Sequence, residues 1–190
     1  NYDTIYNDQT DAIAQNIRQP VQQYGYTGGL AVGYSKPFNE NYFLGAEFAA
    51  NLTSSDANFS AGASSTAFSD QINIQHYFDL LLVQGLNITD SVSAYVKAGL
   101  SCAYVKDSLT SPAGYTPINV TSNSDDYLLG LALGIGMKKR VSDQIALFAE
   151  YQYHDYQKYN LSDFQNLSAT YSHYVNVYSQ AFVLGLSYFV

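Results

Sequence analysis

Tryptophan is absent from this chain, cysteine and methionine occur once each, and proline occurs only four times in 190 residues. The lone cysteine, Cys102, excludes an internal disulfide. Charged side chains make up 13% of the sequence, whereas they make up roughly a quarter of an ordinary soluble domain. No apolar run approaches the roughly 20 residues that a membrane-spanning helix needs, and the mean hydropathy is slightly negative. These absences exclude a disulfide scaffold and a helical membrane protein.

Positive charge is also scarce, with 8 lysines and arginines against 16 acidic residues and a net charge of −8. An acidic chain repels phosphate backbones, so we expect no nucleic-acid partner. The sequence holds no phosphate-binding loop, no histidine and cysteine set with metal spacing, and no nucleophile elbow. We therefore expect no cofactor and no metal. No basic segment followed by an apolar stretch opens the chain, so we expect that any secretory signal has already been removed.

The end of the chain has a regular alternation of large and small residues. Every second residue back from the end is large and apolar: Val190, Tyr188, Leu186, Leu184 and Phe182. The residues between them are mostly small. Because a β-strand sends successive side chains to opposite faces, residues 174–190 predict a strand with one apolar face and one small, partly polar face.

The same alternation recurs in six further segments: 24–35, 41–53, 72–86, 91–105, 125–138 and 144–155. Each is about ten or more residues long, the length with which a tilted strand crosses a bilayer. Single-chain bacterial barrels have an even number of strands, so an eighth strand is expected. The N-terminus is the best place for it, with Tyr2, Thr4 and Tyr6 at its upper end. We expect the chain to begin inside this strand.

The links between the predicted strands alternate in length. Short links cover 36–40, 87–90 and 139–143, and long links rich in Ser, Asn, Asp, Thr and Gly cover 8–23, 54–71, 107–124 and 156–173. Short turns at one rim and long loops at the other are typical of transmembrane barrels. The sequence predicts an all-β, eight-stranded antiparallel up-and-down transmembrane β-barrel, forming one domain over residues 1–190. Its long loops would face outside the cell, and its short turns and both chain ends would face the periplasm.

A soluble barrel or sandwich with the apolar row inward is the structural alternative, because alternation alone does not distinguish inside from outside. The membrane interpretation is favoured because the opposite row is full of Gly, Ala and Ser, and a small barrel has little room inside. Tyrosine, which occurs 19 times, also gathers towards the strand ends, where aromatic girdles flank a lipid-facing band.

The pattern resembles the small eight-stranded outer-membrane barrels, the OmpA-like transmembrane domain and its OmpX-like relatives, over nearly the whole chain. The most specific part is residues 182–190, similar to the C-terminal signal that the barrel assembly machinery reads. Phe182, Leu184, Leu186, Tyr188 and Val190 match its positions, although the family usually ends in an aromatic residue. The resemblance implies a bacterial outer-membrane location and contact with outer-membrane lipid, lipopolysaccharide and the assembly machinery.

Four charged residues fall on the predicted inward row near the middles of four strands: Glu47, Asp79, Lys97 and Glu150. A buried charge must be paired or neutralised, so we expect an ion network that fills the barrel. Because three carboxylates face one lysine, we hypothesise that one keeps a proton near neutral pH, or that water or a cation sits among them. The alternative is a narrow cation-preferring pore. Tyr77, Tyr95 and Phe148 on the same row favour a filled interior.

The sequence best supports a non-enzymatic outer-membrane protein with a structural or surface role, whose long loops serve interaction or adhesion. A small cation-preferring channel is the second interpretation. A lipid-modifying enzyme is the third, because related barrels use histidine with serine and an acid; the histidines here are His76, His154 and His173. His76 falls on the lipid-facing row without a serine and a carboxylate beside it, so we expect no enzyme. A homo-oligomer formed through the tyrosine-rich wall or through a strand edge is a further alternative.

Overall fold

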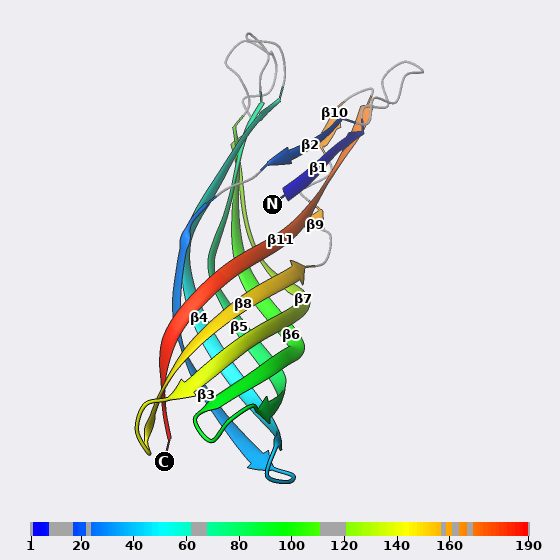
Figure 1. Cartoon of the computed structure of the whole chain (residues 1–190). Helices are drawn as coiled ribbons and strands as arrows, with labels where there is room; N and C mark the ends of the chain where they lie inside the picture. The colour runs from blue at the N-terminus through cyan, green and yellow to red at the C-terminus, as the bar shows by residue number, and fades with distance from the viewer. Residues whose placement is uncertain are drawn as a thin grey trace.

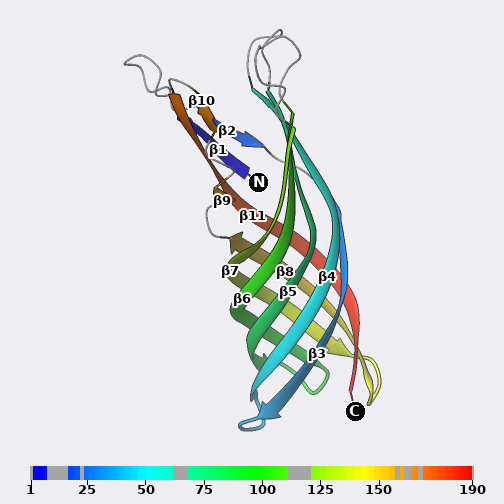
Figure 2. The ribbon, with the colours of Figure 1, turned by 180° about the vertical axis from the view of Figure 1, so that it is seen from behind.

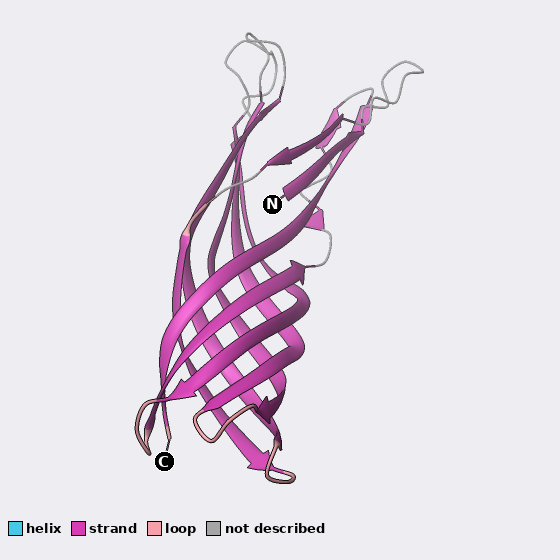
Figure 3. Cartoon of the chain, in the orientation of Figure 1, coloured by secondary structure: helices cyan, strands magenta, loops and turns pink. Residues whose placement is uncertain are grey.

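The computed structural model describes the backbone of residues 2–7, 17–21, 24–61, 68–110, 121–156, 159–160, 164–166 and 169–189. Side chains are described over 24–54, 73–106, 125–156 and 177–189. All regular secondary structure in these ranges is β-strand (Figure 3). Within them, no helix has the length and apolar character to span a membrane.

The described strands form one sheet in the order β2-β1-β11-β8-β7-β6-β5-β4-β3, with β9 and β10 also pairing with β11. Their bounds are β1 Tyr2–Asn7, β2 Ile17–Val21, β3 Tyr26–Pro37, β4 Tyr42–Ala61, β5 Phe68–Asn87, β6 Val92–Thr110, β7 Thr121–Arg140, β8 Ile145–Tyr156, β9 Tyr159–Asn160, β10 Phe164–Asn166 and β11 Ala169–Tyr188.

Seven of these strands, β3 to β8 and β11, are long and pair antiparallel with their neighbours in an up-and-down order. The sheet curls into a half-barrel (Figure 1), and its back view shows β4 to β7 running steeply along the wall (Figure 2). The three short turns and the C-terminal end gather at one end of the sheet (Figure 3). The predicted all-β barrel architecture is confirmed.

Short polar side chains fix the tight turns. The Asn39 Oδ1 atom accepts a hydrogen bond of 2.8 Å from the backbone N–H of Tyr42, and Thr89 Oγ1 accepts one of 3.1 Å from Val92. Asn and Thr side chains that bond the backbone two or three residues on are a common way to close a turn. The turns therefore set the register of the hairpins β3–β4 and β5–β6.

Side-chain exposure follows the two predicted rows. On the outward row, Leu131 is 61% and Leu184 71% exposed, whereas on the inward row Ala132 is 2% and Glu150 1% exposed. The large apolar side chains therefore cover the convex face, and the small and ionic ones the concave face. A wall of this kind suits hydrocarbon outside, because contact with acyl chains removes the unfavourable hydration of the apolar side chains.

Two segments that the sequence predicted as long loops are largely paired strand. The β4–β5 hairpin is paired up to Ala61 opposite Phe68, and the β6–β7 hairpin up to Thr110 opposite Thr121. The loop prediction for most of 54–71 and for the ends of 107–124 was therefore wrong. Polar residues signalled loops, but a polar strand satisfies its backbone groups equally well by pairing.

The other two long links also contain strands. β2 lies within the predicted link 8–23, and β9, β10 and the start of β11 lie within 156–173. β9 and β10 are short and pair beside β11. The loop predictions were therefore also wrong over these stretches. The other parts of the four long links lie outside the described residues: 8–16, 22–23, 62–67, 111–120, 157–158, 161–163 and 167–168.

The N-terminal strand lies where the sequence placed it. β1 pairs antiparallel with the upper part of β11, from Tyr2 opposite Val177 to Asn7 opposite Ser172. Tyr2, Thr4 and Tyr6 thus lie in a strand beside the upper part of β11. The first described residue of β1, Tyr2, lies opposite Val177, away from the turn side of the sheet.

Candidate functional site

A cluster of one lysine and two carboxylates lies on the concave face of the sheet. Lys97 on β6 places its Nζ atom 2.6 Å from Glu47 Oε1 on β4 and 2.8 Å from Glu150 Oε2 on β8. The side chains of Lys97 and Glu150 are 8% and 1% exposed, and that of Glu47 is 22% exposed. One ammonium therefore joins strands that are not neighbours, because β5 and β7 lie between them in the sheet.

Neutral donors complete the surroundings of Glu150. The Tyr95 hydroxyl donates to Oε2 at 2.9 Å, and the Gln152 amide donates to Oε1 at 2.9 Å. Hydrogen bonds to an ionised oxygen are shorter and stronger than bonds between neutral groups. Both carboxylate oxygens of Glu150 are thus satisfied, as a buried charge requires.

Glycines on β7 make room for this cluster. Gly136 pairs with Tyr95 on one side and with Glu150 on the other. A Cβ atom at Gly136 would come 2.6 Å from the Tyr95 ring, and one at Gly134 would come 3.2 Å from Glu150 Oε1. The glycines on the inward row of β7 therefore leave the space through which Tyr95 and Lys97 reach Glu150.

The fourth predicted residue, Asp79, lies in a second cluster. His154 Nε2 is 3.3 Å from Asp79 Oδ1 and 3.4 Å from Oδ2, and the Asn51 amide donates to Oδ2 at 3.3 Å. The other imidazole nitrogen, Nδ1, is 3.4 Å from Ser179 Oγ. Asp79 and His154 are each 1% exposed. The structure thus brings Glu47, Lys97 and Glu150 together and gives Asp79 a separate partner.

The connectivity of Ser179, His154 and Asp79 matches that of a nucleophilic triad, in which an acid orients a histidine beside a hydroxyl. The contacts are at the long end of hydrogen bonding. Neither His154 nor Ser179 lines the cavity at the turn side of the sheet or the pocket around Gln84, Tyr95 and Ile135. We therefore interpret the three residues as a buried polar layer that links β5, β8 and β11.

Apolar packing closes the concave face above the polar clusters. The buried members of this layer are Ile74, Tyr77, Ala103, Val105, Leu128, Tyr156 and Val177. Its two tyrosines place their hydroxyls against polar partners, with Tyr77 3.1 Å from Thr27 Oγ1 and Tyr156 3.1 Å from Ser101 Oγ. Because Tyr77 also stacks edge-on against His154 at 4.9 Å, the layer and the Asp79 cluster form one packed body.

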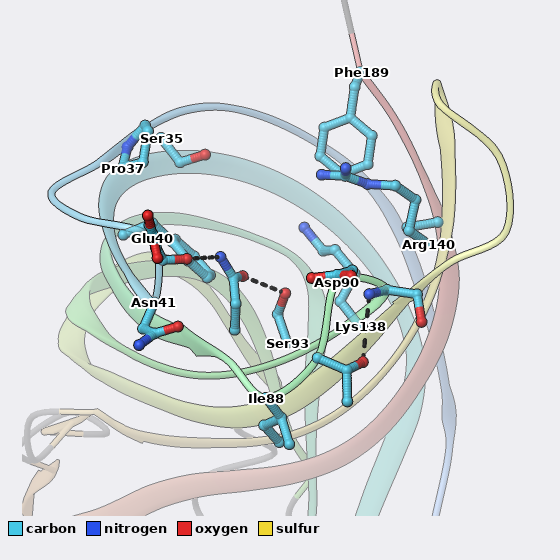
Figure 4. Close-up of a pocket in the computed structure, with 15 residues that line it drawn as sticks. Ser35, Pro37, Glu40, Asn41, Ile88, Asp90, Ser93, Lys138, Arg140 and Phe189 are labelled. Atoms are coloured by element: carbon cyan, nitrogen blue, oxygen red, sulfur yellow. Dashed lines mark hydrogen bonds between the residues drawn. The ribbon is translucent and has the colours of Figure 1, made fainter.

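A polar cavity of about 620 Å³ opens at the turn side of the sheet. Figure 4 shows Lys138, Arg140 and Phe189 on one flank and Glu40 and Asn41 on the other. Lys138 Nζ lies 5.3 Å and Arg140 Cζ 5.7 Å from the centre of the Phe189 ring, within the range of cation–π attraction. The cavity has both charge signs on its walls, so it is a wet vestibule below the packed clusters.

On the convex face, His76 belongs to an aromatic girdle. Its ring stacks on Tyr104 at 4.9 Å and meets Phe78 at 5.6 Å and Tyr127 at 6.4 Å. The Tyr104 hydroxyl donates to Asp125 at 2.7 Å. Amphipathic rings of this kind are favoured where hydrocarbon meets headgroups. His173, in contrast, lies among residues whose side chains are not described.

The predicted assembly signal forms an exposed outward row on β11. Phe182, Leu184, Leu186 and Tyr188 are 66–71% exposed, and Val190 lies outside the described residues. The row continues the apolar wall to the turn-side end of the sheet. That the barrel assembly machinery recognises this row stays a prediction.

Sequence reasoning missed two basic partners of the inner face. His154 pairs with Asp79, and Lys138 turns inward with its Nζ 5.7 Å from the Tyr95 ring centre. Both stand on the inward rows of their strands, so alternation alone marks them. The prediction of three carboxylates facing one lysine therefore undercounted the bases. Within the described residues, no group of three or more His, Cys, Asp or Glu side chains could hold a metal ion.

Comparison with known proteins agrees with this architecture. Residues 1–188 match the family described as the outer membrane protein beta-barrel domain. An uncharacterised protein of Coxiella burnetii is 30% identical over 186 residues, covering 90% of this chain and 72% of that protein. The 31 kDa outer-membrane immunogenic proteins of Brucella melitensis and Brucella suis are 27% identical over 142 residues, covering 75% of this chain. The chain spans 58% of the length of these Brucella relatives.

Among solved structures, Ail, the attachment invasion locus protein of Yersinia pestis, is similar at a TM-score of 0.44 and 15% identity. The alignment covers 98% of this chain and 91% of that one. The family match extends over all the strands described above, and the inward and outward rows obey the pattern of a transmembrane barrel. The chain belongs to the outer membrane protein beta-barrel domain family and is a protein of the bacterial outer membrane.

Proposed function

We propose that this protein is a non-enzymatic surface protein, in which a barrel with a filled interior holds β-ribbons outside the cell. The single observation that supports it best is Lys97, whose ammonium bridges Glu47 and Glu150 from opposite sides of the concave face. A mobile ion crossing that level would have to break a buried, hydrogen-bonded ion pair. Removing one partner of such a pair costs about 3–5 kcal/mol because it leaves a buried charge uncompensated.

The second support is the extent of the paired hairpins. β6 and β7 remain paired for six residue pairs beyond the girdle pair Tyr104 and Tyr127, up to Thr110 opposite Thr121. At about 3.3 Å per residue, this places the paired ends roughly 20 Å beyond the girdle. A rigid scaffold that carries polar ends clear of the membrane suits recognition of an extracellular partner or surface.

The lipid contacts of this proposal follow from the convex face. The aromatic girdle around Tyr104 places Lys106 beside it, with its Nζ 5.9 Å from the Tyr104 ring centre. A cation at the headgroup level attracts the phosphates of lipopolysaccharide, and the outward leucines contact acyl chains. The exposed row Phe182, Leu184, Leu186 and Tyr188 would be read by the barrel assembly machinery during insertion.

A small cation-preferring channel is the second candidate, favoured by the 22% exposure of the Glu47 side chain and by the wet vestibule at the turn side. Planar-bilayer recording separates the two functions. We expect no reproducible conductance steps from the folded protein, and steps only after Lys97→Ala opens the ion pair. Steps from the unmodified protein that disappear in Glu47→Gln and Glu150→Gln would establish the channel instead.

The surface role has its own test. A variant in which residues 57–72 are replaced by a two-residue Asn-Gly turn shortens the β4–β5 ribbon and leaves the bilayer-spanning part intact. We expect normal insertion with reduced attachment of the bacteria to host cells or matrix. A second variant shortens the β6–β7 ribbon between the paired residues Lys106 and Asp125. Unchanged attachment with both ribbons shortened would contradict the proposed role.

A further inference from the structure

The polar cavity at the turn side carries opposite charges on opposite flanks. Lys138 and Arg140 of β7 form one flank together with Phe189, and Glu40 stands on the other, in the turn between β3 and β4 (Figure 4). The volume of about 620 Å³ falls within the range of sites that hold a small molecule. The cavity is therefore a candidate binding site, separate from the ion pairs buried above it.

The Phe189 ring holds the two cations of the basic flank. Lys138 Nζ lies 5.3 Å and Arg140 Cζ 5.7 Å from its centre. Among the side chains that the structure describes, the ion pairs belong to Lys97 and His154, and neither cation of this flank forms one. An aromatic ring attracts a cation without using up all its N–H donors. Both side chains can therefore donate to an oxyanion, and a guanidinium can hold a carboxylate by two parallel bonds.

Hydrogen bonds fix the acidic flank in place. The Ser93 hydroxyl donates to Asn87 Oδ1 at 2.8 Å, and the Asn87 amide donates to the backbone carbonyl of Glu40 at 3.1 Å. Within the turn, Asn39 Oδ1 accepts a bond of 2.9 Å from the backbone N–H of Asn41. The turn that carries Glu40 is thus tied to β5 and β6. The carboxylate of Glu40 forms no ion pair with a described side chain, so it can receive a cation.

The two signs of charge decide the class of ligand. Lys138 and Arg140 give the cavity two positive charges, and Glu40 and Asp90 give it two negative ones. A simple anion would be attracted by one flank and repelled by the other, and the same holds for a simple cation. A molecule with a carboxylate at one end and an ammonium at the other complements both flanks.

We propose that this cavity binds a short zwitterionic peptide. Its free carboxylate lies against Lys138 and Arg140, and its free ammonium lies against Glu40. The Asn41 side chain lines the cavity beside Glu40, and its amide can bond the peptide groups between the two ends. The short turns of transmembrane barrels face the periplasm, so the peptide comes from that compartment.

The chain itself supplies matched controls. In each of the three short turns, an acidic residue follows two positions after the residue whose backbone N–H closes the turn: Glu40, Asp90 and Asp143. Glu40 and Asp90 line the cavity, whereas Asp143 does not. Lys139 is the neighbour of Arg140 and does not line the cavity either. Asp143 and Lys139 therefore carry the same charges as the two flanks at the same rim of the sheet.

The test measures the binding of trialanine, which has both charged ends, to the folded protein in lipid nanodiscs. Backbone amide signals are followed by nuclear magnetic resonance during the titration. The comparison ligands are trialanine amide, which lacks the carboxylate, and N-acetyl-trialanine, which lacks the ammonium. We expect saturable shifts at the amides of Asn41 and Arg140 with trialanine. Each blocked peptide should bind about fivefold more weakly, because it loses one partly exposed charge pair.

Two variants assign the ends of the peptide. Arg140→Gln should weaken trialanine binding about fivefold and leave the affinity for trialanine amide unchanged, because that ligand has no carboxylate to lose. Glu40→Gln should also weaken trialanine binding and leave the affinity for N-acetyl-trialanine unchanged. The controls Lys139→Gln and Asp143→Asn should alter none of these affinities. If Arg140→Gln fails to fold, Glu40→Gln with its two ligands decides the question.

Three results would overturn the proposal. The first is the absence of saturable shifts with millimolar trialanine, or equal affinity for trialanine and both blocked peptides. The second is a loss with Lys139→Gln and Asp143→Asn as large as with the flank variants, which would show attraction by the charge of the rim alone. The third comes from a chain with Gly-Ser added after Val190: binding that appears only in this chain would assign the basic flank to the protein's own terminal carboxylate.

Discussion

Replacing Lys97 with methionine should destabilise the folded protein by about 3 kcal/mol. The substitution keeps much of the side-chain volume and removes the ammonium that lies 2.6 Å from Glu47 and 2.8 Å from Glu150. Glu47 is partly solvated and tolerates the loss. Glu150 is 1% exposed and keeps only its neutral donors, Tyr95 and Gln152. Removing one partner of a buried pair costs about 3–5 kcal/mol, and these two donors place the cost at the lower end.

The measurement is urea unfolding in lipid vesicles, followed by far-ultraviolet circular dichroism because the chain has no tryptophan. A double-mutant cycle provides the control: adding Glu150→Gln to Lys97→Met removes the uncompensated charge and should restore about 2 kcal/mol, since the cost of breaking a buried pair lies mainly in the charge left behind. A loss below about 1 kcal/mol for Lys97→Met, or a double variant no more stable than the single one, would refute the assignment of Lys97 as a buried bridge.

Three further predictions concern other parts of the wall. Gly136→Val should lower the free energy of unfolding by about 2–4 kcal/mol, because the added side chain overpacks against Tyr95 and removes its hydrogen bond. Adding Tyr95→Ala should restore part of this stability in the same urea measurement. Leu131→Arg should cost about 2–4 kcal/mol in vesicles because it puts a charge into hydrocarbon, and Leu131→Gln clearly less; equal costs would contradict a lipid-facing row. Asp79→Asn should cost about 1–3 kcal/mol by leaving His154 without its acid, and a neutral effect in thermal melts would show that the pair is not stabilising.

Alternation predicted the facing of most side chains, but it was wrong for Ile74, which is 4% exposed on the inner face because the register shifts between Ile74 and His76. Leu131, Leu184 and Phe48 all lie on the exposed row, as the sequence predicted. Tight turns were also predictable, because their Asn and Thr residues act within three positions of themselves. Such features depend on neighbours along one strand, and a single sequence contains that information.

The partners of the inner charges were not predictable in the same way. Lys97 reaches Glu47 across β5 and Glu150 across β7, and which residues meet on such diagonals depends on the register of every intervening pair. Asp79 fell in the same predicted network, but the structure pairs it with His154. The extent of the ribbons was missed for another reason, since polar strands lack the apolar row that marks a strand in a membrane.

The paired ribbons have a mechanical consequence. A pull on the outer end of the β6–β7 hairpin moves its two strands together, so the load falls on the ladders that join β6 to β5 and β7 to β8. Many hydrogen bonds would then have to shear together before the wall gives way, instead of opening one after another. For the surface role proposed above, this arrangement would let the ribbons carry tension along the strands.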